Sequence, residues 1–107
     1  MPPSTVLVLT TLPADADAGA FGRVLVEERL AACVSVLGRL HSIYRWNGAI
    51  EEVLEQQLVI KTDASAVEAL KRRIGTLHPY DVPELLVVPV SDGGEAYVSW
   101  VRRSIAG

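Results

Sequence analysis

The sequence predicts an α+β fold in which strands and helices follow one another in the order βαββαβ, with a further helix at the C-terminal end. Two observations carry this prediction. Short runs of β-branched and other apolar residues alternate with segments whose apolar residues recur at helical spacing. The dipeptide Asn47-Gly48 joins two of the apolar runs directly, and it is a strong signal for a β-hairpin because both residues tolerate a positive φ.

The first strand and the first helix are predicted from residues 5–28. Residues 5–10 form a nearly continuous apolar run, which is typical of a strand that is covered on both faces or lies in a subunit interface. Pro13 ends the run, and Asp15 or Asp17 can accept hydrogen bonds from the free amides at the start of a helix. Glu28 falls on the apolar face of this helix, near its end, where we expect solvent. The apolar residues that share this face are Ala20, Phe21, Val24 and Leu25.

A long hairpin is predicted from the next segment of the chain. Residues 33–37 begin the second strand, Gly38 marks a bend or a bulge, and residues 40–46 continue the strand. After the Asn47-Gly48 turn, residues 50–62 form the return strand, with an apolar inner half. Its outer half carries three glutamates, at Glu51, Glu52 and Glu55. We therefore expect the tip of the hairpin to project beyond the core.

The second helix follows this hairpin. Ser65 and Glu68 have the spacing of a capping box, in which the serine side chain accepts from a backbone amide of the first turn. His78-Pro79 ends the helix, because a residue before proline is disfavoured in the α region. The apolar side chains between these limits form a one-face stripe of Val67, Leu70, Ile74 and Leu77.

The fourth strand and the last helix complete the order. Residues 85–88 are apolar, and Pro83 and Pro89 place this strand at an edge of the sheet or give it a bulge. Asp92 and Glu95 suggest another capping box. The packing face of the last helix consists of Tyr97, Val98, Val101 and Ile105. The whole order is the ferredoxin-like arrangement, a βαββαβ sandwich with a C-terminal helix and a long hairpin between its second and third strands.

The composition and net charge exclude some classes of function for this chain. Hydrophobic residues make up 50% of the 107 residues, a high share for a small protein, so another subunit can cover part of the apolar surface. The net charge is −3, and the basic cluster at residues 71–73 is best explained as a solvated helix face, so we expect no nucleic-acid partner. No apolar run has the length of a membrane span, and we expect no membrane partner. The single cysteine, Cys33, and the lack of a signal-peptide pattern at residues 1–3 suit a cytoplasmic protein.

The ferredoxin-like fold supports several functions in other proteins, but this sequence lacks the residues that those functions require. A soft-metal chaperone needs a pair of thiolates after the first strand, where this chain has Thr10 and Thr11. An acylphosphatase needs an arginine in the same loop to hold phosphate, and none precedes Arg23. An RNA-binding sheet needs stacking aromatics on its first and third strands, which have none. We find no nucleophile with a nearby base, and we expect no enzyme.

The segment His78-Pro79-Tyr80-Asp81-Val82-Pro83-Glu84 concentrates the polar chemistry of the chain. An imidazole and the carboxylates of Asp81 and Glu84 are ligands that suit a borderline divalent metal. The alternative is structural: two prolines fix a turn, His78 caps carbonyl groups at the helix end, and the acids are solvated. The residues alone leave both interpretations open.

Five stretches of the chain resemble the CutA family of divalent-cation tolerance proteins. Residues 25–34 resemble its join between first helix and second strand, residues 42–48 its hairpin, and residues 60–62 its third strand. Residues 77–84 resemble its signature turn, and residues 97–100 its closing helix. Each piece is modest, but together they cover nearly the whole chain in the right order. We therefore expect one CutA-like domain over residues 1–107.

The resemblance implies a homotrimer whose hairpins reach neighbouring subunits, with clefts between subunits near the His78 turn. It also implies a link to divalent-cation and copper tolerance, and no catalytic activity. Aromatic side chains that suit the trimer interface are Tyr44, Trp46 and Trp100.

The metal ligands proposed in the family include a cysteine at the end of the first strand, a histidine at the turn and the glutamate after it. This chain keeps His78 and Glu84, but has a threonine where the cysteine would be. The expected metal set is therefore His78 and Glu84, with Asp81 as a further oxygen ligand. We expect Cu(II) or Zn(II) to bind weakly there, and we expect no metal to be required for folding.

The second functional hypothesis also comes from the resemblance, because trimers of the family are similar in outline to the PII signalling proteins. A sensor of that kind would bind a small anion or nucleotide in the cleft, with Arg45 supplying further charge. The expected binding cleft consists of Cys33, Tyr44, Trp46, Lys61 and Tyr80. The alternative for Cys33 is that the thiol is simply a small buried hydrophobic group.

Overall fold

The computed structural model of the chain describes residues 4–106, so both ends of the predicted domain 1–107 lie outside the described part. The predicted ferredoxin-like α+β fold is confirmed, with one sheet in the strand order β2-β3-β1-β4 and antiparallel pairing throughout. The elements are β1 (Thr5–Pro13), α1 (Ala18–Glu27), β2 (Cys33–Trp46), β3 (Ala49–Asp63), a 3₁₀ turn (Ala64–Ala66), α2 (Val67–Leu77), β4 (Leu86–Pro89) and α3 (Glu95–Ala106). Within residues 4–106 no helix is long and apolar enough to cross a membrane.

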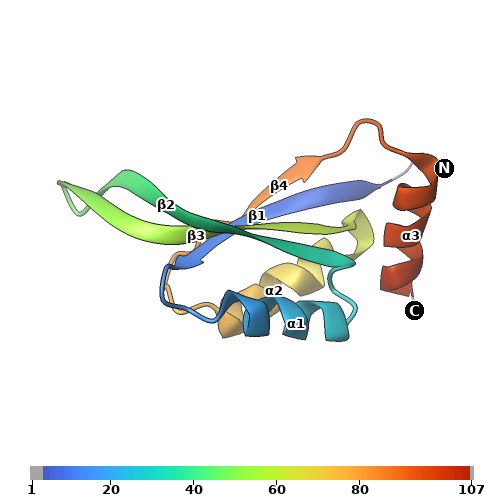
Figure 1. Ribbon diagram of the computed structural model, residues 1–107, viewed down its shortest axis with the longest axis horizontal. Coiled ribbons are helices and arrows are strands. Elements are labelled where there is room, and N and C mark those ends of the chain that lie inside the picture. Colours follow the sequence, from blue (N-terminus) through green and yellow to red (C-terminus); the bar gives the residue numbers. More distant parts are fainter. Residues whose placement is uncertain (1–3, 107) are drawn as a thin grey trace.

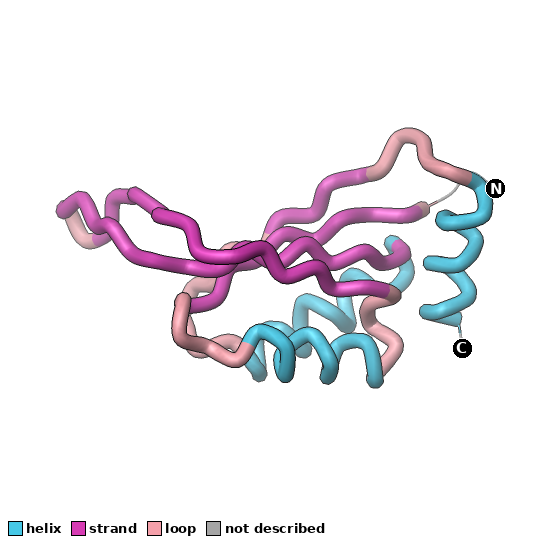
Figure 2. The backbone as a smooth tube through the Cα atoms, viewed as in Figure 1, coloured by secondary structure: helices cyan, strands magenta, loops and turns pink. Residues whose placement is uncertain are grey.

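The helices are arranged unevenly around the sheet. Figure 1 shows α1 and α2 together on one side of the sheet, below it in this view, and α3 at the end opposite the tip of the hairpin. Figure 2 shows that the β2-β3 hairpin extends well beyond the helices. The molecule measures 46 × 26 × 23 Å as a result.

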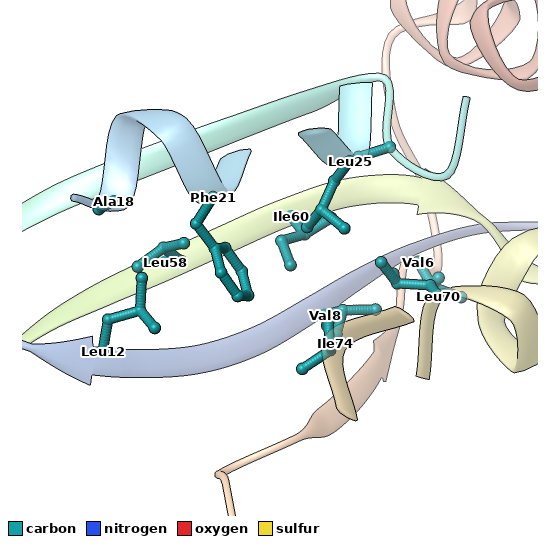
Figure 3. Close-up of a cluster of buried hydrophobic side chains, with 11 residues drawn as sticks. Val6, Val8, Leu12, Ala18, Phe21, Leu25, Leu58, Ile60, Leu70 and Ile74 are labelled. Carbon is teal, nitrogen blue, oxygen red and sulfur yellow. The ribbon is translucent and has the colours of Figure 1, made fainter. Parts of the chain in front are cut away.

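The core lies between the sheet and helices α1 and α2. Figure 3 shows Phe21 and Leu25 of α1 directed toward Leu58 and Ile60 of β3. Full burial of each large apolar side chain contributes about 1.5–3 kcal/mol, so this cluster is the main source of stability. Its members are Val6, Val8, Leu12, Ala18, Phe21, Leu25, Ala31, Leu58, Ile60, Leu70 and Ile74.

The long hairpin has the predicted turn and the predicted bulge. Asn47 and Gly48 both have positive φ, 50° and 79°, as a tight primed turn requires. The pairing of β2 with β3 shifts by one residue between Leu37 and Arg39, which places the bulge at Gly38. β1 accompanies β3 only as far as Glu55. Beyond that residue β2 and β3 pair only with each other, so the outer half of the hairpin is a two-stranded ribbon.

The predicted ends of the first helix and the predicted edge position of the fourth strand are confirmed. Asp17 caps α1, since its carboxylate accepts from the Ala20 amide at 2.9 Å. Glu28 lies at the solvent-exposed helix end and accepts two hydrogen bonds from Arg73 of α2, at 2.9 Å each. Within residues 4–106 β4 pairs only with β1, so it is an edge strand. The missing backbone N–H of Pro89 is tolerated in such a strand.

Both predicted capping boxes were wrong. Asp63, at the end of β3, accepts from the Ser65 amide at 3.0 Å and from the Ser65 hydroxyl at 2.6 Å, so that hydroxyl does not cap α2. A carboxylate is a stronger acceptor than a hydroxyl, which is why the aspartate takes this position. Asp92 accepts from the Gly93 amide instead, and α3 begins two residues later, at Glu95.

Candidate functional site

A pocket of about 790 Å³ lies where β1 ends beside the projecting hairpin. This volume is within the usual range of small-molecule sites, about 300–1,000 Å³. Its wall combines one side of the outer hairpin with the segment that follows α2. The lining residues are Thr11, Ser42, Ile43, Tyr44, Trp46, Val53, Glu55, Pro79, Tyr80, Asp81, Val82 and Glu84.

Side chains alternate between the two faces of a strand, and this alternation positions half of the pocket wall. Ser42, Tyr44 and Trp46 are two residues apart along β2, so they face the same side of the ribbon. Val53 pairs with Ser42 and is followed two residues later by Glu55 on β3. The hairpin therefore presents aromatic, apolar and acidic side chains to one space.

His78 fixes the other half of the wall. The residue is only 8% exposed, and Nε2 lies 2.6 Å from the carbonyl oxygen of Thr11. Because a carbonyl only accepts, Nε2 carries the proton, and the neutral Nδ1 accepts from the Tyr80 amide at 3.1 Å. Phe21 packs edge-on against the same ring. His78 therefore joins the turn to β1, and its ring does not cap the carbonyl groups of α2.

Tyr80 and Glu55, which both line the pocket, form a partly buried hydrogen bond. The Tyr80 hydroxyl donates to Oε2 of Glu55 at 2.8 Å, and Glu55 is only 5% exposed. Burial, together with this carboxylate, raises the pKa of Tyr80 to about 12. Tyr80 therefore remains a proton donor throughout the physiological range.

Sequence reasoning missed Glu55 as a site residue. It grouped this side chain with Glu51 and Glu52, which are exposed on the outer half of β3. Glu55 differs because it pairs with Pro13, the last residue of β1, and so lies at the step in the sheet that the segment after α2 covers. No local pattern in the sequence reports the length of β1 relative to β3.

The three predicted metal ligands have different environments within a single chain. Among residues 4–106 no group of three or more His, Cys, Asp or Glu side chains is placed to hold an ion. Both ring nitrogens of His78 are engaged, and Oε2 of Glu84 accepts from the Gln57 amide group at 3.1 Å. Asp81 is exposed at the pocket wall. Within one chain the donor set therefore does not fit a closed Cu(II) or Zn(II) site.

The predicted cleft residues divide into two places. Tyr44, Trp46 and Tyr80 line the pocket, whereas Cys33 and Lys61 do not. Those two pair across β2 and β3, and the Lys61 ammonium lies 3.8 Å from the Cys33 sulfur. Cys33 is only partly buried. The alternative prediction, a fully buried apolar thiol, therefore does not describe it. Among the residues that the structure describes, the pocket lining contains three carboxylates and no lysine or arginine.

The predicted interface aromatics also occupy different ends of the molecule. Tyr44 and Trp46 lie on the outer hairpin, and both are exposed. Trp100 lies on α3, where its ring is 5.4 Å from that of Tyr97. Figure 1 shows these two elements at opposite ends of the long axis.

The fold and the pocket define a ferredoxin-like α+β domain with a ligand-sized, acidic and aromatic site. A family model described as "CutA1 divalent ion tolerance protein" matches residues 6–104, and the chain belongs to this family. It is 44% identical over 98 residues to the divalent-cation tolerance protein CutA of Thermus thermophilus, covering 92% of this chain and 95% of that protein.

Solved structures agree with this assignment. The crystal structure of CutA from Xylella fastidiosa has a TM-score of 0.91 at 46% identity, covering 95% of this chain and 98% of that one. A protein described as the PII-like protein CutA from Nostoc has a TM-score of 0.86 at 35% identity, covering 94% and 96%. The resemblance drawn from the sequence is confirmed at the level of family and fold.

Proposed function

We propose that this chain is a homotrimeric, cytosolic, non-enzymatic protein of divalent-cation tolerance. Its relatives carry the name of divalent-cation tolerance proteins, which supports the tolerance role. The observation that supports assembly is the number of large apolar side chains that a single chain leaves exposed on its hairpin and on β4. Monomeric proteins rarely expose contiguous apolar patches of more than a few hundred Å².

Two parts of this surface carry the argument. The first, which we name the hairpin patch, comprises exposed side chains on both sides of the outer ribbon: Tyr44 and Trp46 on one side, and Ile43, Ile50 and Leu54 on the other. Ile50 is 60% exposed. The second, the edge patch, comprises Leu86, Val87 and Val88 of β4, and Leu86 is 57% exposed. β2 and β4 are the two edges of the sheet, and edge strands need to be covered or blunted to prevent uncontrolled pairing. Further copies of the chain would cover both patches.

The experiment that tests this proposal is a mass measurement by sedimentation equilibrium at micromolar concentration. We expect about three times the chain mass of 11.6 kDa. A particle of one chain mass would contradict the proposal, because the two patches would then remain exposed.

In our proposal divalent metal binds weakly, through the carboxylates of Asp81 and Glu84, while His78 keeps its structural hydrogen bonds. Cu(II) should bind more tightly than Zn(II), following the general order of divalent affinities. The test is calorimetry with both ions on the wild type and on Glu84→Gln. Equal heats for the two proteins would contradict the assignment, and so would unfolding on chelation.

The second candidate function is a sensor that binds a small molecule in the pocket. The volume of the pocket and the PII-like description of the Nostoc structure favour it. The expected anion or nucleotide is not favoured, because the lining contains no basic side chain and both Lys61 and Arg45 lie outside it. A thermal-shift screen tests the sensor, since a ligand that binds only the folded state raises the melting temperature. An unchanged melting temperature across charged and neutral metabolites would remove this candidate.

A further inference from the structure

Helix α3 carries an aromatic pair that is exposed in the single chain. Tyr97 and Trp100 are 47% and 39% exposed, and their rings lie 5.4 Å apart, whereas Val101 on the inner side of the helix is fully buried. Arg103 follows Trp100 by one turn, on the same side of the helix, and is exposed as well. We name this surface of Tyr97, Trp100 and Arg103 the helix face. Tryptophan, tyrosine and arginine are the residue types that contribute most to binding at protein interfaces.

One side of the outer hairpin has a matching composition with the opposite charge. Tyr44 and Trp46 lie on this side, and Glu51 joins them because it pairs with Tyr44 across the ribbon. All three side chains are exposed. Arg45 points to the other side, since side chains alternate along a strand. This side therefore combines two aromatic rings with one negative charge.

The charges select which of these surfaces meet when copies of the chain assemble. The ion pairs formed among residues 4–106 include neither Glu51 nor Arg103. A contact of hairpin with hairpin would bring a negative charge from each copy together, and a contact of helix face with helix face would bring two positive charges together. Like charges across an interface oppose association, whereas opposite charges favour it and fix its register. Hairpin against helix face is the arrangement that joins opposite charges.

The positions of the two surfaces favour a head-to-tail arrangement of chains. Figure 1 shows the hairpin tip and α3 at opposite ends of the long axis, so one chain cannot bring its own two surfaces together. A contact between two different surfaces of identical chains propagates from copy to copy, and it forms a closed ring where the rotation allows. In a ring of three, each copy would dock one hairpin and receive another, and every copy of both surfaces would be covered.

We propose that the helix face of one copy is the docking surface for the Tyr44 and Trp46 side of a neighbouring copy's hairpin, with Glu51 of the hairpin paired to Arg103 of the receiving copy. The inference rests on the proposed homotrimer and names the surface that receives each hairpin. The two fail separately, because a particle of three chain masses that lacks this contact would overturn the inference and leave the homotrimer standing.

Cross-linking between chains tests the contact directly. Cys33→Ser removes the single native thiol, and two exposed alanines become cysteine in its place. Ala49→Cys lies opposite Trp46 on the hairpin, and Ala96→Cys lies one turn before Trp100 on α3. We expect a short bismaleimide, which bridges two thiols, to link the doubly substituted chains into species of two and three chain masses on a denaturing gel. A trimer that yields no linked chains would overturn the proposal.

A matched pair of cysteines controls for random collision. Glu68→Cys replaces Ala96→Cys and places the second thiol at an exposed position on α2, away from the helix face. We expect this pair to link at least about tenfold less than the first pair under the same conditions, because the reagent then depends on chance encounters. Equal linking of both pairs would overturn the proposal.

Charge reversal tests the ion pair in a protein that keeps its native thiol. Glu51→Lys and Arg103→Glu should each raise the concentration of half-assembly, measured by sedimentation equilibrium, about tenfold or more. The double variant restores opposite charges and should return to within about threefold of the wild type. The matched control combines Arg103→Glu with Glu52→Lys, which pairs with Ile43 and so lies on the other side of the ribbon. Recovery in this control as complete as with Glu51→Lys, or single variants that assemble as the wild type does, would overturn the proposal.

Discussion

The inner and outer halves of the same hairpin differ in what stabilises them. In the inner half, Leu58 and Ile60 of β3 are fully buried beneath α1 and α2, and β1 pairs alongside. In the outer half, Ile43 and Ile50 are 65% and 60% exposed, and the ribbon has no third strand. The inner half is therefore stabilised by contacts within the chain, whereas we propose that further copies of the chain stabilise the outer half.

The largest expected effect is the contrast between Ile60→Ala and Ile50→Ala. Removing the buried side chain should lower the free energy of unfolding by about 2–5 kcal/mol at every protein concentration. Ile50→Ala, which removes the exposed side chain, should lower the free energy of unfolding by less than about 0.5 kcal/mol in dilute solution. A larger loss is expected only at protein concentrations at which the chains assemble. Urea unfolding at several protein concentrations checks both. Equal losses at all concentrations would remove the distinction between the halves.

The Tyr80–Glu55 hydrogen bond lies where the two halves of the hairpin meet, because Glu55 is the last residue of β3 that pairs with β1. Alkaline pH should weaken this hydrogen bond. The pKa of Tyr80 is raised from 10.0 to about 12, so the folded state holds the proton more tightly than the unfolded state. This contribution to stability is complete below pH 10 and is lost as pH rises from 10 to about 12.

The measurement is the free energy of unfolding across that range for the wild type and Tyr80→Phe. The substitution should reduce the alkaline loss, and Tyr97→Phe serves as a matched control away from the pocket. Identical pH profiles for the wild type and Tyr80→Phe would show that the bond to Glu55 does not matter. Burial and, second, Cys33 raise the pKa of Tyr97 as well, so Tyr97→Phe shows the effect of removing a tyrosine whose pKa is raised without a hydrogen bond to Glu55.

The tip of the hairpin should give the smallest effect. Gly48 has φ 79° with open space around the position of a Cβ atom, so Gly48→Ala meets backbone strain without a steric clash. The expected cost is about 1 kcal/mol, in line with the penalty for a left-handed residue that is not glycine. Thermal unfolding measures it. Gly38→Ala, at the bulge and also with open space, is the control and should change stability less.

The sequence predicted the order of the elements because each strand and helix carries its own local signal. The positive φ values of Asn47 and Gly48 and the edge position of β4 follow from turn and proline chemistry. The capping of α2 was mispredicted because Ser65 matches a motif, yet Asp63, at the end of the preceding strand, is the stronger acceptor. Local motifs do not report such competition.

The site was predicted only in part, because its members meet through tertiary structure. The turn at residues 78–84 and the aromatics of the hairpin were identified, since their residue types are unusual together. The direction of the His78 ring toward Thr11 and the burial of Glu55 depend on where β1 ends. Lys61 and Cys33 suggested a cleft by their chemistry, but they lie outside the pocket.

We propose that the outer hairpin is an assembly surface, and sedimentation equilibrium of the wild type beside Ile50→Glu and Glu52→Gln decides this. We expect a particle of three chain masses for the wild type and for Glu52→Gln. Ile50→Glu should sediment as a smaller particle, because it places a charge within the hairpin patch. A wild type of one chain mass, or an Ile50→Glu variant that assembles as the wild type does, would show that the outer hairpin is not an assembly surface.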